Sequence, residues 1–125
     1  MLDWRVQING RDPDGWDPRR DGCYFPDFDH QEYLLPFFDV GDTPLDPYDG
    51  CEFLEGDLRR LRTHLRCYRA GFEARPTTWS ITETLDAQSH TIHLERDKIL
   101  NVIDRTLQMI DFALSHGGTL MFRGD

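Results

Sequence analysis

The sequence predicts an α+β fold in which a single, mostly antiparallel sheet carries two helices packed on one of its faces. Two kinds of pattern indicate this fold. Apolar residues recur at helical spacing in two long segments, whereas other segments alternate apolar with polar residues, as strands do. The predicted order is β-β-β-α-β-β-α-β. Because the 125 residues contain no internal repeat and no linker, residues 1–125 are expected to form a single domain.

The first 56 residues are expected to contain three strands separated by turns. Proline and glycine punctuate this part of the chain, and the two prolines inside the second and third strands favour edge positions or bulges (Pro26 and Pro36). The expected segments are a strand at 2–8, a turn-rich segment at 11–22, strands at 23–28 and 33–40, and a loop at 43–56.

Residues 57–72 are predicted to form a helix with one buried stripe and an arginine row beside it. The apolar positions step by three and four residues, at Leu58, Leu61, Leu65, Tyr68 and Phe72. Each member of the row follows a stripe residue by one position, and the row comprises Arg59, Arg62, Arg66 and Arg69. We expect these arginines to pair with acidic residues of the first half of the chain. Contact with phosphate or RNA is the alternative.

Residues 77–84 and 89–94 are predicted to form an antiparallel hairpin with one buried face. Both segments are rich in β-branched residues and alternate in polarity. Successive side chains of a strand point to opposite faces, so His90 and His93 cannot share a metal ion. His90 falls on the face of Ile92 and Leu94 and is a candidate core histidine, whereas His93 is expected on the surface.

Residues 95–125 are expected to organise the core as a long helix followed by a strand. Apolar residues cover about half of the helix circumference, at Ile99, Leu100, Val102, Ile103, Leu107, Met109, Ile110, Ala113 and Leu114. Gly117 and Gly118 mark the end of the helix. The apolar run at 119–122 then predicts a strand in the middle of the sheet. Phe112 falls on the polar side, where the N-terminal segment covers it or a partner contacts it.

The charge of the chain is strongly asymmetric. The net charge is −9, and residues 1–57 alone hold 15 acidic and 4 basic residues, a net charge of −11. The same residues include 10 of the 15 aromatic side chains. Such a field repels nucleic acid and acidic lipid and attracts basic partners. Solubility alone is the simpler explanation of the charge.

Membrane and secretory signals are not evident in the sequence. No apolar run approaches the roughly 20 residues of a membrane span. The three cysteines, Cys23, Cys51 and Cys67, are an odd number and follow no secretory signal, so we expect free thiols in a cytoplasmic protein.

One cluster could carry chemistry. Asp27, Asp29, His30 and Glu32 could bind a divalent metal or act as acid and base. On the predicted strand, however, Asp27 and Asp29 share one face and His30 points to the other. An acidic surface strand is therefore the expected role, and the prediction names no catalytic residue, metal or cofactor.

Three stretches support a family resemblance: the acidic, aromatic N-terminal segment, the run LDPYDGCEFLEGDLRRLR at 45–62, and the ending TLMFRGD at 119–125. Together they resemble bacterial polymorphic-toxin immunity proteins, which are encoded beside toxins of contact-dependent and type VI secretion systems. The resemblance implies a cytoplasmic inhibitor without enzymatic activity that binds a cognate toxin domain. These immunity proteins share no catalytic motif, so the resemblance assigns no functional role to any individual residue of this chain.

The leading functional hypothesis is therefore an immunity protein whose acidic, aromatic surface blocks the basic active-site cleft of a toxin. The predicted contact residues are Trp16, Asp27, Asp29, Glu32, Asp39, Asp42, Asp46, Tyr48 and Asp49. No nucleic-acid or membrane partner is expected, and the sequence does not determine the toxin or the oligomeric state. The alternatives are a metal-dependent hydrolase that uses Asp27, Asp29 and His30, and an effector chaperone or adaptor.

Overall fold

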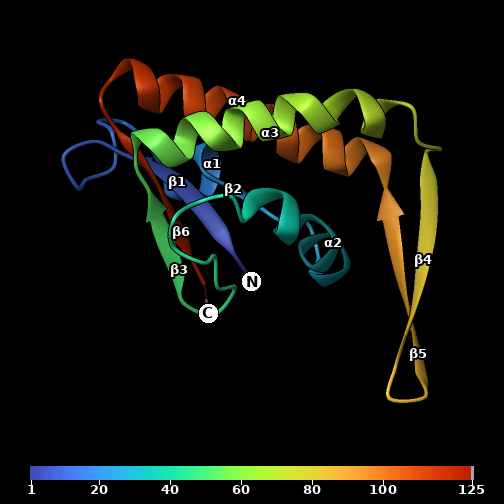
Figure 1. Cartoon of the computed structure of the whole chain (residues 1–125). Coiled ribbons are helices and arrows are strands. Elements are labelled where there is room, and N and C mark those ends of the chain that lie inside the picture. The colour runs from blue at the N-terminus through green and yellow to red at the C-terminus, as the bar shows by residue number, and fades with distance from the viewer. Residues whose placement is uncertain (125) are drawn as a thin grey trace.

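The computed structural model describes residues 1–124 and has an α+β fold with two antiparallel sheets (Figure 1). The larger sheet has the strand order β2-β1-β6-β3, and the smaller consists of β4 and β5. The elements in chain order are β1 (Asp3–Gln7), α1 (Pro18–Asp21), β2 (Cys23–Tyr24), α2 (Phe28–Phe38), β3 (Gly50–Phe53), α3 (Glu55–Glu73), β4 (Thr78–Leu85), β5 (Gln88–Glu95), α4 (Arg96–Ser115) and β6 (Thr119–Arg123).

The last strand, β6, lies in the middle of the larger sheet, as predicted. It pairs with β1 on one side and with β3 on the other, so that Phe122 is opposite both Trp4 and Cys51. Leu120 and Phe122 are fully buried or nearly so. An apolar strand in this position satisfies its backbone hydrogen bonds on both sides while its side chains enter the core.

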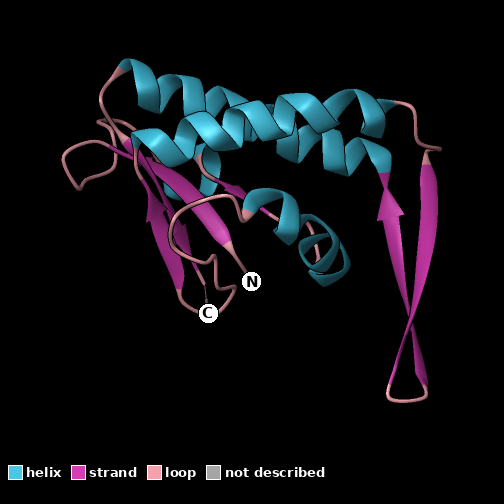
Figure 2. Ribbon diagram, in the orientation of Figure 1, coloured by secondary structure: helices cyan, strands magenta, loops and turns pink. Residues whose placement is uncertain are grey.

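The two long helices, α3 and α4, run side by side over the larger sheet (Figure 2). Their apolar stripes are largely buried as the periodicity predicted, but Tyr68 of the predicted α3 stripe is 44% exposed. An aromatic cluster fills the space between sheet and helices, and its centre is Trp4. The Trp4 ring lies 4.8 Å from Phe25, 5.2 Å from Phe38 and 5.5 Å from Phe122, measured between ring centroids.

The strand predicted at 33–40 is wrong, because residues 28–38 form helix α2. The buried residues His30, Leu34 and Phe38 are four apart, which is helical spacing. The Asp27 carboxylate accepts a hydrogen bond from the His30 N–H at 2.9 Å and so caps the helix. The strand predicted at 23–28 is also shorter than expected, since only Cys23 and Tyr24 pair with β1.

Strand β3 lies inside the segment predicted as a loop at 43–56. Gly50 begins it with φ of +83°, and a Cβ atom at this position would lie 2.1 Å from the Phe122 carbonyl oxygen. Only glycine permits this close approach between β3 and β6. The turn-rich segment at 11–22 similarly contains the short helix α1.

The predicted hairpin is confirmed, but the prediction of a single sheet is wrong. β4 and β5 pair only with each other, and Figure 1 shows them extending away from the larger sheet. Asp86 and Ala87 form the connecting turn with φ of 50° and 64°, as a two-residue hairpin turn requires. None of the helices in residues 1–124 is long and apolar enough to cross a membrane.

Candidate functional site

The segment 39–49, here called the acidic loop, joins α2 to β3 and gathers five of the nine predicted contact residues. It contains Asp39, Asp42, Asp46, Tyr48 and Asp49, and it has no basic residue. The Tyr48 side chain is 78% exposed, more than any other large hydrophobic residue of the described chain. The Asp42 side chain is 90% exposed. The loop therefore presents an aromatic ring among carboxylates.

Internal hydrogen bonds hold the acidic loop in place. The Asp39 carboxylate accepts a bond from the Leu45 N–H at 2.9 Å, and Leu45 itself is buried. The Asp46 carboxylate accepts one from the Tyr48 N–H at 2.8 Å. At the other end of the loop, Asp57 accepts a bond from the Asp42 N–H at 3.2 Å. Tyr48 is thus carried by an ordered turn, which lowers the entropy that binding would cost.

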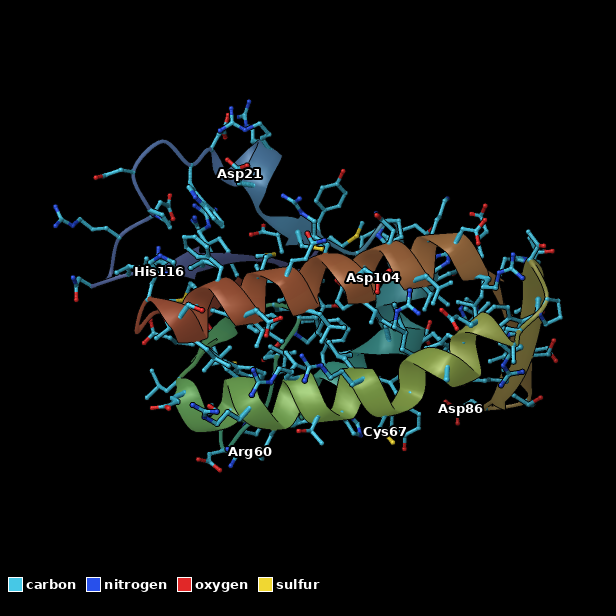
Figure 3. All side chains as sticks on the ribbon, turned by 90° about the horizontal axis from the view of Figure 1, so that it is seen from above. Asp21, Arg60, Cys67, Asp86, Asp104 and His116 are labelled. Atoms are coloured by element: carbon cyan, nitrogen blue, oxygen red, sulfur yellow. The ribbon has the colours of Figure 1, made fainter. Side chains whose placement is uncertain are left out.

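Arg60 links the acidic loop to helix α3. Its guanidinium contacts Asp57 and lies 3.1 Å from the Asp42 carboxylate. It also donates to the carbonyl of Val40 at 3.2 Å. Figure 3 shows Arg60 on the side of α3 that faces away from α4. The cation neutralises one end of the loop and leaves Asp46 and Asp49 beyond its contacts.

The possible metal or acid–base cluster was predicted to lie on a strand, and that prediction is wrong. Its members, Asp27, Asp29, His30 and Glu32, lie around the first turns of α2, where the cluster contacts the hairpin. His30 is 1% exposed, and its Nε2 accepts a hydrogen bond from the Glu95 N–H at 3.0 Å. Asp29 accepts one from the His93 N–H at 3.0 Å. Glu32 lies 3.5 Å from His90 across the same junction.

The contacts of this junction also define which ring nitrogen of His30 carries the proton. Because Nε2 of His30 accepts a bond, Nδ1 carries the proton and donates it to Asp27 at 2.7 Å. Desolvation opposes ionisation of Asp27, but hydrogen bonds from the His30 backbone and ring outweigh it and lower the pKa of Asp27 below its usual value. These contacts are structural and connect α2 to β5.

The same contacts weaken the metal-site interpretation of this cluster. Both ring nitrogens of His30 are engaged within the protein. Over residues 1–124, no group of three or more His, Cys, Asp and Glu side chains is placed to hold a metal ion. His90 is exposed, so its predicted place in the core is wrong, and the prediction that His93 lies on the surface is confirmed.

Trp16 is separate from the acidic loop and covers the end of α4. Its ring lies 4.9 Å from Phe112, which stacks on His116 at 4.1 Å. Of the two roles predicted for Phe112, coverage by the N-terminal segment is therefore the one observed. Trp16 is half-buried in this contact.

The arginine row pairs within the molecule, as predicted, but mostly with α4 rather than with the first half of the chain. Arg62 lies 3.3 Å from Asp111 and Arg69 lies 2.6 Å from Asp104. Figure 3 shows Asp104 on the side of α4 toward α3. The hydrogen bond from Arg69 lowers the pKa of Asp104. Only Arg59 finds its partner, Glu55, in the first 57 residues, at 2.9 Å.

A basic pocket between α1 and α4 was not predicted. Its volume is about 270 Å³, and its lining includes Arg19, Arg20, Lys98, Arg105 and the exposed Tyr24. Lys98 and Arg105 are seven residues apart on one face of α4, which was the available signal. Arg105 already donates to the Arg20 carbonyl at 2.8 Å, and Lys98 lies 2.6 Å from Glu95. Lys98 is therefore paired with a carboxylate, as is Arg20 with Asp21, and Arg105 is held by a backbone carbonyl.

The three cysteines are free, as predicted. Burial raises the pKa of the Cys23 thiol to about 11, and it raises the pKa of Cys51 to about 11 as well. Both thiols are therefore protonated and weakly nucleophilic at neutral pH. Cys67 is exposed on the outer side of α3 (Figure 3).

In the acidic loop, the most exposed large hydrophobic side chain of residues 1–124, Tyr48, lies among exposed carboxylates with no basic residue in the segment. The other predicted contact residues mainly support the fold. No protein-family model matches the chain, and neither a curated protein nor a solved structure matches it.

Proposed function

We propose that the chain is an immunity-type protein that binds a basic cognate toxin domain through the acidic loop and blocks the toxin's active-site cleft. The observation that carries the proposal is the exposure of Tyr48, 78%, within a segment of four carboxylates and no basic residue. Exposed aromatic residues are the usual anchors of protein–protein interfaces. The surrounding carboxylates supply the charge that a basic cleft would attract.

The proposed contact surface has a smaller centre than the nine predicted residues. Asp42, Asp46, Tyr48 and Asp49 are exposed on one loop. Asp27, Asp29 and Glu32 instead serve the junction with the hairpin, and Trp16 packs on α4. The net charge of −11 in residues 1–57 adds a long-range attraction for a cationic partner.

The first experiment is co-expression of the chain with the product of the neighbouring toxin gene. We expect cells to survive and a stable complex to elute from size-exclusion chromatography. Death of the cells and separate elution of the two proteins would refute the proposal.

The second experiment separates steering from anchoring by stopped-flow kinetics. Asp46→Asn with Asp49→Asn should slow association roughly 10-fold at low salt and reduce its salt dependence. Tyr48→Ala should mainly accelerate dissociation. The control, Asp14→Asn with Asp86→Asn, removes two charges elsewhere and should leave the kinetics near those of the parent. Equal effects of the two double variants would exclude a role for the acidic loop.

Toxin activity in the complex distinguishes an immunity protein from an effector chaperone or adaptor. A chaperone or adaptor would bind without inhibition, so the toxin would stay active in the complex.

The hydrolase alternative predicts that Mn²⁺ or Zn²⁺ raises the melting temperature of the chain and that EDTA lowers it. The engagement of His30 with Asp27 and Glu95 disfavours that alternative.

A further inference from the structure

The outer edge of β4 is an open strand edge. β4 pairs with β5 on one side through an unbroken register from Thr78↔Glu95 to Leu85↔Gln88, and Figure 1 shows β4 as the outermost strand. The two-residue turn makes Leu85↔Gln88 a hydrogen-bonded pair, and such pairs alternate along the ladder. The N–H and C=O groups that point away from β5 therefore belong to Thr78, Ser80, Thr82 and Thr84.

The two edges of the hairpin differ. On β5, the outward N–H groups of His93 and Glu95 are bonded by Asp29 and His30 of α2. Among residues 1–124, neither a further strand nor a side-chain hydrogen bond covers the outward N–H groups of β4. The β4 edge also has no proline, lysine or bulge, which are the usual devices that protect an edge. A two-stranded hairpin is marginally stable alone, so an additional strand would stabilise this one.

We propose that two copies of the chain pair antiparallel through their β4 edges, about a twofold axis at Ile81. In this register Ser80 is opposite Thr82 of the second copy, and Thr78 is opposite Thr84. All outward backbone groups of β4 then find partners. The two hairpins become one continuous sheet, and the Thr and Ser side chains extend a polar row that already joins Thr82 to Thr91 at 3.2 Å.

Charge complementarity selects the second copy and this register. Within residues 1–124, Arg75 and Glu83 form no ion pair, and the Arg75 guanidinium lies 5.3 Å from the centroid of the Trp79 ring. The twofold register places Glu83 of the second copy directly opposite Trp79, as a pair whose side chains approach closely. Each Arg75 thus gains a carboxylate, and the symmetry repeats the contact. A shift of two residues in either direction moves Glu83 opposite Ile81 or Thr77 and loses this pair.

Disulfide trapping tests the register. The Cα atoms of the two Ile81 residues would lie about 4.5 Å apart, as in non-hydrogen-bonded antiparallel pairs, which is within the range of a disulfide. In a Cys67→Ser background, Ile81→Cys should form a covalent dimer at least roughly 10-fold faster than Thr82→Cys, which would face Ser80 of the second copy. Equal or slower trapping of Ile81→Cys would overturn the register.

Sedimentation equilibrium tests the edge itself. The parent chain should show concentration-dependent dimerisation, and Thr82→Pro should abolish it by removing an outward N–H group. The control, Thr91→Pro, makes the same change at the paired residue on β5 and should keep the dimer. Circular dichroism melts establish that both variants are folded.

Charge reversal provides a test that does not alter the backbone. Arg75→Glu and Glu83→Arg should each weaken the dimer, and the two changes together should restore it. A chain that remains monomeric at every concentration overturns the proposal, as does a dimer that none of these variants affects. If the edge binds a strand of a different protein instead, the isolated chain would be monomeric, and the proposed self-pairing would be overturned.

Discussion

Both sheets of this protein are antiparallel, but they differ in how their strands are paired and covered. In the larger sheet, β6 is paired on both sides and its side chains pack under α3 and α4. In the smaller sheet, the edge strand β4 pairs only with β5, and the tip of the hairpin extends away from the helices (Figure 1). The comparison indicates that the larger sheet carries most of the stability of the fold. The hairpin edge and the acidic loop are the two surfaces that we propose for partner binding.

The largest expected contrast is between the two tryptophans that occupy these sheets. Trp4 is fully buried in the larger sheet, so Trp4→Ala should reduce the free energy of unfolding by about 3–5 kcal/mol. Trp79 is half-buried at the base of the hairpin, and Trp79→Ala should cost about 1–3 kcal/mol. Urea unfolding followed by circular dichroism measures both. Equal losses would contradict the different roles of the sheets.

The next effect concerns the polar bond inside the larger sheet's core. The Trp4 Nε1–H donates to Thr106 Oγ1 at 3.1 Å, and Thr106 is fully buried. Thr106→Val should cost about 1–3 kcal/mol, because it leaves a buried donor without an acceptor. Thr63→Val is the control, since the hydroxyls of Thr106 and Thr63 each donate to a carbonyl of their own helix, but Thr63 lies at an exposed site and accepts no tryptophan bond. We expect it to change stability by less than about 0.5 kcal/mol.

The junction between α2 and the hairpin should show a smaller, local effect. Asp29→Ala removes the acceptor of the His93 N–H, so amide hydrogen exchange at His93 should accelerate roughly 5-fold for a loss of about 1 kcal/mol. Exchange in β6 should be unchanged. Glu32→Ala, which breaks only the exposed contact to His90, is the control. If exchange accelerated equally in β6, the hairpin would not be a separate unit.

The smallest effect concerns acid pH. The pKa of Asp104 is lowered below 3.8 by Arg69, so the pair stabilises the fold above that pH and the contribution is lost as pH falls through the lower, folded-state pKa. Arg69→Gln should destabilise the fold only slightly at pH 7, because both side chains of the pair are partly exposed. The difference from the parent should shrink steadily as the pH falls below 3.8 and through the folded-state pKa of Asp104. A difference that does not shrink with falling pH would indicate packing rather than charge.

The candidate site was only partly predictable. The acidic loop could be identified because its carboxylates and Tyr48 lie close together within one short segment, residues 39–49. The roles of Asp27, Asp29 and Glu32 could not, because their partners His30, His93 and His90 are brought to them by α2 and the hairpin. Trp16 looked available for a partner, yet it packs on Phe112. Charge alone does not show which carboxylates the fold has already used.

Local periodicity was sufficient for α3, α4, β1, β6 and the hairpin, because each buries one face whose residues recur at a fixed interval. The other elements depend on contacts distant in sequence. Strand β3 can form because Gly50 lies close against the backbone of Phe122. Helix α2 is positioned by its contacts with the aromatic core and with the hairpin. The hairpin forms its own sheet because the outer edge of β5 contacts α2 and not another strand. The spacing of residues along the chain thus predicts which face of an element is apolar. Which element covers that face depends on long-range packing, which spacing does not record.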